Sequence, residues 1–151
     1  MANSYYTLRE NEVELFALQA SSVVVGDGNA QFVKRLVNQI VNALKRLPVI
    51  GCCFGNKADI VVTNQRVLII EHSKFLCIRE NVSVVALSNK VLDGFNYFDY
   101  QKAAICCKLF KFSIGICRGM NPACIEFETH NISTVEEASA IIAKFDEIII
   151  R

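Results

Sequence analysis

The chain has 151 residues, a formal net charge of +1 and an apolar fraction of 52%. This length predicts a single domain over residues 1–151, and this composition predicts a folded chain rather than a disordered one. The small net charge excludes a broadly basic nucleic-acid-binding protein. The longest stretch without a charged or amide side chain is residues 47–55, far shorter than the roughly 18 apolar residues of a spanning helix.

The first predicted element is a strand over residues 13–25, with a soft break at Ser21 and Ser22. A turn at 26–29 stops it, and Asp27 or Asn29 can cap the helix that follows. That helix is predicted over residues 30–47, where Pro48 ends it.

The predicted helix 30–47 divides into an apolar and a polar half. The polar half includes Lys34, Arg35, Lys45 and Arg46, and the surrounding segment 29–58 holds five basic residues and no acidic one. The helix either packs on the sheet, or on a second copy, with its basic residues solvated, or it lies in a membrane interface. In the membrane case its basic half meets anionic headgroups. The apolar half is formed by Phe32, Val33, Leu36, Val37, Ile40, Val41, Ala43, Leu44 and Leu47.

The middle of the chain is predicted to be β-structure. Strands are expected at 60–63, 67–71, 75–79, 82–87, 105–117 and 123–130, from β-branched runs and alternation. Asp93 and Gly94 predict a loop that carries the aromatic cluster 95–100. Glu126 and Glu128 point the same way on one strand, which is typical of a solvated face.

The last predicted element is an amphipathic helix introduced by a capping box at residues 133–136, in which Ser133 and Glu136 satisfy each other's amides. Its apolar stripe is Val135, Ala138, Ile141, Ile142, Phe145, Ile148 and Ile149. The element order predicts an α+β fold: a small antiparallel β-barrel or sandwich of about seven strands, capped by the C-terminal helix. The helix after the first strand is an insert, at about 29–56.

Residues 58–70 contain Thr63 and Arg66 in a Thr-x-x-Arg pattern, followed by an apolar strand. This pattern, with the strands after it and the charged-then-apolar start at residues 12–15, resembles bacterial pleckstrin-homology-like (PH-like) and GRAM-like domains. The resemblance covers about residues 8–25 and 57–150 and implies the PH-like fold. Eukaryotic members bind phosphoinositides through basic residues on the first two strands. Here only Lys57 remains near that position, so this activity is not carried over.

No pattern for catalysis, cofactor binding or metal binding is visible. The seven cysteines have no Cys-x-x-Cys spacing and are expected to be small buried hydrophobic residues in a reducing cytosol. His72 and His130 lack the partners of a catalytic triad or a zinc site. Arg66 is expected to bind backbone carbonyls at a turn.

The sequence therefore predicts a non-enzymatic PH-like module for protein–protein contact or self-association, located in the cytoplasm. No nucleic-acid partner, small-molecule substrate, cofactor or metal is expected. The alternative is a peripheral module at the inner face of the membrane that uses helix 30–47, and an enzyme ranks third. The candidate residues for binding a partner or a membrane are Lys34, Arg35, Lys45, Arg46, Phe54, Phe95, Tyr97 and Phe98.

Overall fold

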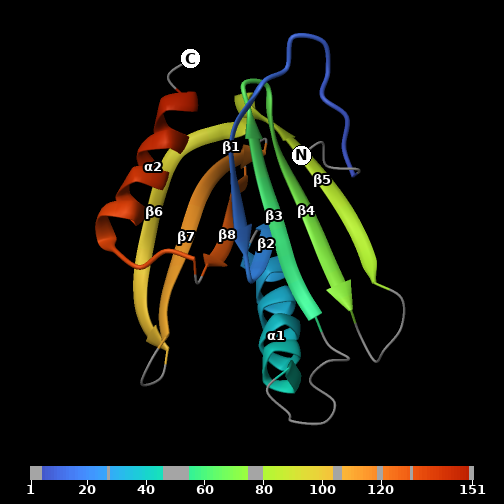
Figure 1. Cartoon of the computed structure of the whole chain (residues 1–151), viewed down its shortest axis with the longest axis vertical. Coiled ribbons are helices and arrows are strands. Elements are labelled where there is room, and N and C mark those ends of the chain that lie inside the picture. Colours follow the sequence, from blue (N-terminus) through green and yellow to red (C-terminus); the bar gives the residue numbers. More distant parts are fainter. Residues whose placement is uncertain are drawn as a thin grey trace.

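Two four-stranded antiparallel sheets pack against each other, with one helix at their side and another at one end (Figure 1). The computed structural model describes residues 5–26, 28–45, 55–74, 80–103, 107–118, 121–129 and 131–149. Its elements are β1 (Glu14–Ala20), β2 (Ser22–Gly26), α1 (Gly28–Lys45), β3 (Gly55–Thr63), β4 (Arg66–Lys74), β5 (Asn81–Ser88), the 3-10 turn η2 (Asn89–Val91), β6 (Leu92–Ala103), β7 (Cys107–Arg118), β8 (Asn121–Thr129) and α2 (Val135–Ile149).

The predicted α+β class, with antiparallel strands and a C-terminal helix, is confirmed. The first sheet has the strand order β1-β3-β4-β5 and the second β2-β8-β7-β6, so the described strands form two sheets and no closed barrel. The predicted break at Ser21 is where the chain passes from one sheet to the other. There the Ser21 amide and hydroxyl both donate to the Glu128 carbonyl, at 2.8 and 3.1 Å. The predicted strand 75–79 lies outside the described residues.

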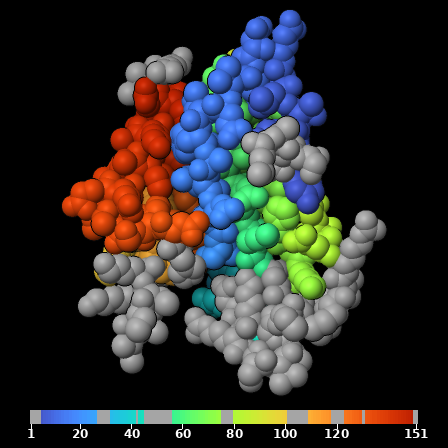
Figure 2. Space-filling model, viewed as in Figure 1, coloured from blue at the N-terminus to red at the C-terminus, as the bar shows by residue number. Residues whose placement is uncertain are grey.

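The core forms between the inner faces of the sheets and is closed by α2. Alternation along the strands turns one side chain in two inward, and the rings of Phe112 and Phe127 stack at 4.9 Å in the middle. From α2, Ala138, Ile141, Phe145 and Ile148 are buried in the same cluster. In Figure 1 this helix runs beside β6, and Figure 2 shows it on the side of the molecule next to β1.

The start of α2 corrects two predictions by one residue. Thr134 rather than Ser133 closes the helix end, because the Glu137 amide donates to its hydroxyl at 3.3 Å. Glu137, not Glu136, returns the bond: its carboxylate accepts from the Ser133 and Thr134 amides at 2.9 and 3.4 Å. Val135 is exposed, so the buried stripe of α2 begins one turn later than predicted.

The loop predicted at residues 93–100 is wrong, because β6 continues through it. The turn signal comes from a β-bulge: Leu92 pairs with Ile116 and Asn96 with Ile114, which places three residues of β6 opposite Gly115 alone. Gly94 has φ +89° there, and a side chain at Gly115 would collide with Asp93. The two glycines therefore permit the bulge. The same residues are typical of a turn, which is why the sequence pattern predicts a loop here.

The Thr-x-x-Arg pattern holds the N-terminal residues against the first sheet. Arg66 Nε donates to the Glu12 carboxylate at 2.8 Å, and its Nη2 donates to the Thr7 carbonyl at 2.8 Å. The Thr63 hydroxyl donates to the same carboxylate at 2.7 Å. Arg66 thus binds a backbone carbonyl as predicted, and in addition a buried carboxylate. Its hydrogen bond lowers the pKa of Glu12 to about 2, against the effect of burial.

Because Glu12 stays ionised in the folded protein below its ordinary pKa, it stabilises the fold above the unfolded-state pKa of 4.5 and loses that contribution as pH falls toward about 2. We expect Arg66→Ala to lower the free energy of unfolding at neutral pH by about 3 kcal/mol, since it leaves a buried carboxylate unpaired. Urea unfolding from pH 7 to pH 3 should show a smaller loss of stability in Glu12→Gln than in the wild type. An equal dependence of the unfolding free energy on pH in the two proteins would contradict this role of Glu12.

Candidate functional site

Helix α1 packs on the sheets through its polar half. Lys34 Nζ lies 2.6 Å from Glu71 Oε1 on β4, and Arg35 Nε lies 2.8 Å from Glu126 Oε2 on β8. One turn further along α1, Asn38 Oδ1 accepts a hydrogen bond of 2.8 Å from Asn56 Nδ2 on β3. One helix face therefore binds strands of both sheets, next to the edge strand β2.

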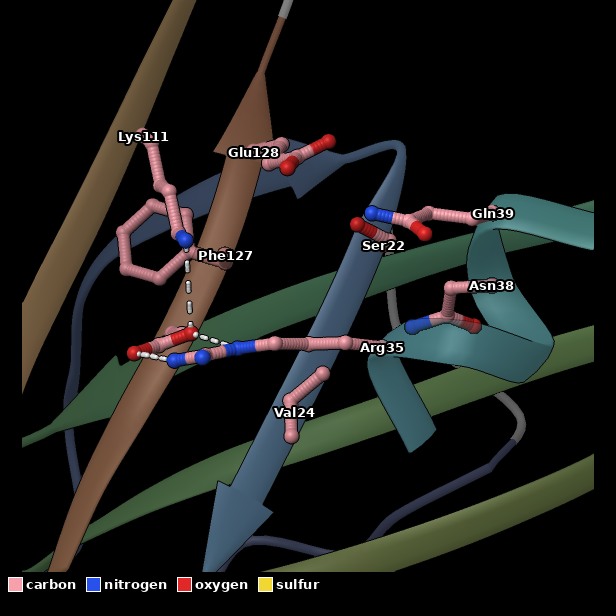
Figure 3. A pocket seen from close by; sticks show the side chains of 9 residues that line it. Ser22, Val24, Arg35, Asn38, Gln39, Lys111, Phe127 and Glu128 are labelled. Carbon is pink, nitrogen blue, oxygen red and sulfur yellow. Dashed lines mark hydrogen bonds and ion pairs between the residues drawn. The ribbon is translucent and has the colours of Figure 1, made fainter. Parts of the chain in front are cut away.

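The strongest of these contacts is at Glu126, whose side chain is only 9% exposed. Figure 3 shows Arg35 reaching across β2, over Val24, to this carboxylate, while Lys111 approaches it from β7. Arg35 donates to both carboxylate oxygens, and Lys111 Nζ lies 3.6 Å from one of them. Burial by itself raises the pKa of Glu126, but the hydrogen bonds and charges of Arg35 and Lys111 outweigh it and hold that pKa below its ordinary value. The same bond raises the pKa of Arg35.

The opposite half of α1 is apolar and mostly faces away from the sheets, and Val37 at its border also lines a hollow between α1 and the strands β2, β3 and β4. We call it the α1 apolar face, and it consists of Phe32, Val33, Leu36, Val37 and Ile40, whose exposed fractions are 67, 62, 48, 50 and 51%. None of the described α1 side chains belongs to the hydrophobic core. Monomeric proteins seldom leave such a contiguous apolar surface open, and where it occurs it marks an interaction site.

Helix α1 could turn either its polar half or its apolar half toward the sheets, and the free-energy cost of each orientation decides between them. The Glu126 carboxylate is buried and the Glu71 carboxylate is half-buried. A buried carboxylate without a cation costs several kcal/mol of folding free energy. The cations that α1 brings to them, Lys34 and Arg35, lie on its polar half. Turning the apolar half inward would gain about 1 kcal/mol for each half-exposed side chain but would leave Glu71 without Lys34 and the buried Glu126 with Lys111 alone. The cost of leaving these carboxylates without their α1 cations exceeds the gain from burying the apolar side chains, so the apolar half faces outward.

Three sequence-based expectations are corrected at this site. Lys34 and Arg35 are not simply solvated, because both are ion-paired to the sheets. Glu126 is not on a solvated face, because α1 covers it. Among the other basic candidates, the Lys45 side chain and Arg46 lie outside the described residues, as does Phe54.

The aromatic candidates divide between the two faces of β6. Phe95 and Tyr97 are 78% and 56% exposed, on the outer face of the second sheet. Phe98 points the other way and packs on Phe112, with ring centroids 6.0 Å apart. Phe95 and Tyr97 therefore remain available to a partner, whereas Phe98 belongs to the core packing.

Sequence reasoning missed the acidic anchors Glu71 and Glu126. The available signal was the charge imbalance, since a segment with five bases and no acid needs carboxylates elsewhere to pair with. It could not name them, because Glu71 and Glu126 come from distant strands that only the fold brings together.

The other side chains that could bind a metal or take part in catalysis lie apart from one another in the described residues. Within the described ranges, no three His, Cys, Asp or Glu side chains are grouped so as to hold a metal ion. His72 is buried between Asp59 and Glu80, at 3.5 and 3.7 Å, with the ring of Tyr5 against it. Cys117 is exposed and Cys124 half-buried, so the expectation of buried cysteines is wrong for Cys117.

Comparisons of the chain with protein-family models, curated proteins and solved structures find no match. Neither helix in the described part of the chain is long and apolar enough to cross a membrane. The site must therefore be interpreted from its own geometry.

We expect Arg35→Ala to lower the free energy of unfolding by about 1–3 kcal/mol, because Lys111 alone would then face the buried Glu126 carboxylate. Chemical denaturation at neutral pH measures the change. Gln39→Ala is the matched control, since Gln39 is an exposed polar residue one turn further along α1, and it should change stability by less than about 0.5 kcal/mol. Equal effects of the two substitutions would contradict the anchoring role of Arg35.

Proposed function

We propose that this chain is a non-enzymatic PH-like binding and assembly module that docks through the α1 apolar face, with protein contact or self-association as its activity. The observation that carries the proposal is the orientation of α1, which keeps five large apolar side chains outside while its charges bind the sheets. The arrangement of two antiparallel sheets with a C-terminal helix that closes the core supports the PH-like assignment.

The size of the face supports association that depends on concentration. Fully burying a side chain of this kind yields about 1.5–3 kcal/mol, so one that is about half exposed yields roughly 1 kcal/mol. Two such faces in contact gain about 10 kcal/mol in total, against an association cost of about 4–15 kcal/mol. The face by itself therefore supports weak and reversible contact.

A protein partner is favoured over a membrane by the direction of the bases. An interfacial helix gains much of its affinity from cations that meet anionic headgroups. Lys34 and Arg35 are instead occupied by Glu71 and Glu126, on the side of α1 opposite to the apolar face. A peripheral membrane module remains the second candidate, because an exposed apolar helix half can also enter the interfacial region of a bilayer.

Light scattering at micromolar and at millimolar concentration tests assembly. We expect the apparent mass to rise above the monomer mass of 16.9 kDa as concentration increases, because burial of the α1 apolar face is then driven by mass action. A monomer at both concentrations would count against self-association.

Vesicle flotation tests the membrane alternative. We expect the wild type to stay out of the vesicle fraction with both neutral and anionic phospholipids, because Lys34 and Arg35 are paired within the protein. Flotation of the wild type that Leu36→Glu abolishes would favour the membrane module instead, since Leu36 lies on the α1 apolar face.

A further inference from the structure

We infer that the occupant of the α1 apolar face is the same face of a second copy, so that two α1 helices pack against each other across a twofold axis. This inference rests on the proposed function and names its partner. In such an isologous contact each subunit offers the same surface, so the assembly closes at two copies.

The spacing of the exposed side chains is that of a helix-pairing seam. Val33, Leu36 and Ile40 follow one another at intervals of three and four residues, which are the a, d and a positions of a heptad. The next d position is the small and exposed Ala43, and Leu47 is the next a position in the sequence, beyond the described end of α1. β-branched residues at a with leucine at d favour two-helix assemblies over larger ones.

The residues beside the seam are apolar as well. Phe32 and Val37 hold the g and e positions, which carry charges in many coiled coils, and both are at least half exposed here. The contact between two helices is thereby widened by one apolar residue on each side of the seam. A contiguous apolar surface of this kind supports helix pairing better than scattered surface contacts do.

The charge distribution permits the helix to meet its own copy. Self-pairing of a basic helix is normally opposed by like charges across the contact. In α1, Lys34 and Arg35 lie on the opposite side and are neutralised by Glu71 and Glu126. Two α1 apolar faces can therefore approach without bringing these cations together, and the ion pairs within each subunit stay intact.

Leu36 gives the sharpest test, because it lies in the middle of the α1 apolar face. If the two helices run parallel, Leu36 is a d position and meets Leu36 of the other copy. If they run antiparallel, the twofold axis passes near the centre of the face, and the two Leu36 side chains meet there as well. Leu36→Glu and Leu36→Lys should each place like charges against each other. At a concentration where the wild type is a dimer, each variant should have the monomer mass of 16.9 kDa by light scattering.

The equimolar mixture of the two variants should regain the dimer mass, since glutamate in one copy then faces lysine in the other. Ser139→Glu and Ser139→Lys are matched controls, because Ser139 is an exposed residue of α2 outside the proposed interface, and both should stay dimeric. An unchanged circular dichroism spectrum shows that the Leu36 variants fold, as expected at a half-exposed position.

Two results would overturn the pairing of α1 helices while leaving the proposed assembly function in place. They are a dimer that persists in both Leu36 variants, and single variants that are monomeric but fail to recover on mixing. The first would place the interface elsewhere on the molecule, and the second would mean that the α1 apolar face meets a different surface. A wild type that is monomeric at every concentration would reject self-association itself.

Discussion

The buried carboxylate of Glu126 determines what the protein can present to a partner. It lies on the outer face of the second sheet, where a helix must cover it, and only a helix that turns cations inward can do so at tolerable cost. Arg35 binds it with a two-pronged contact, Lys111 adds a second charge, and Lys34 repeats the interaction at Glu71 on the other sheet. Once these contacts form, the remaining half of α1 has to face outward.

The two helices have similar patterns but opposite uses. Helix α2 buries its apolar stripe in the core, around Phe145, and leaves its acidic side in solvent. Helix α1 buries its polar side and leaves Phe32 and Leu36 exposed. The difference arises from what lies beneath each helix: α2 covers the open apolar side of the two sheets, whereas α1 covers carboxylates. Amphipathicity alone therefore does not determine which half of a helix meets the protein.

This limits how much of the site could be read from the sequence. Periodicity is a local property, so it located both helices, most strands and the corner at Ser21. The bulge at Gly94 produced a turn signal inside a strand, because permissive backbone positions look alike in a bulge and a loop. The direction of α1 depends on Glu71 and Glu126, which lie about 37 and 91 residues away from their partners along the chain. Such pairings follow from the topology and leave no trace in local pattern.

The place of α1 in the chain agrees with a role outside the fold itself. The described part of the core draws on both sheets and on α2, and none of the described α1 side chains enters it. A helix that completes no core contributes little hydrophobic stabilisation, and its own ordering costs conformational entropy. Its ion pairs hold it in one orientation, and that orientation displays the α1 apolar face. The polar contacts are thus best understood as the means by which the protein keeps an apolar surface positioned for a partner.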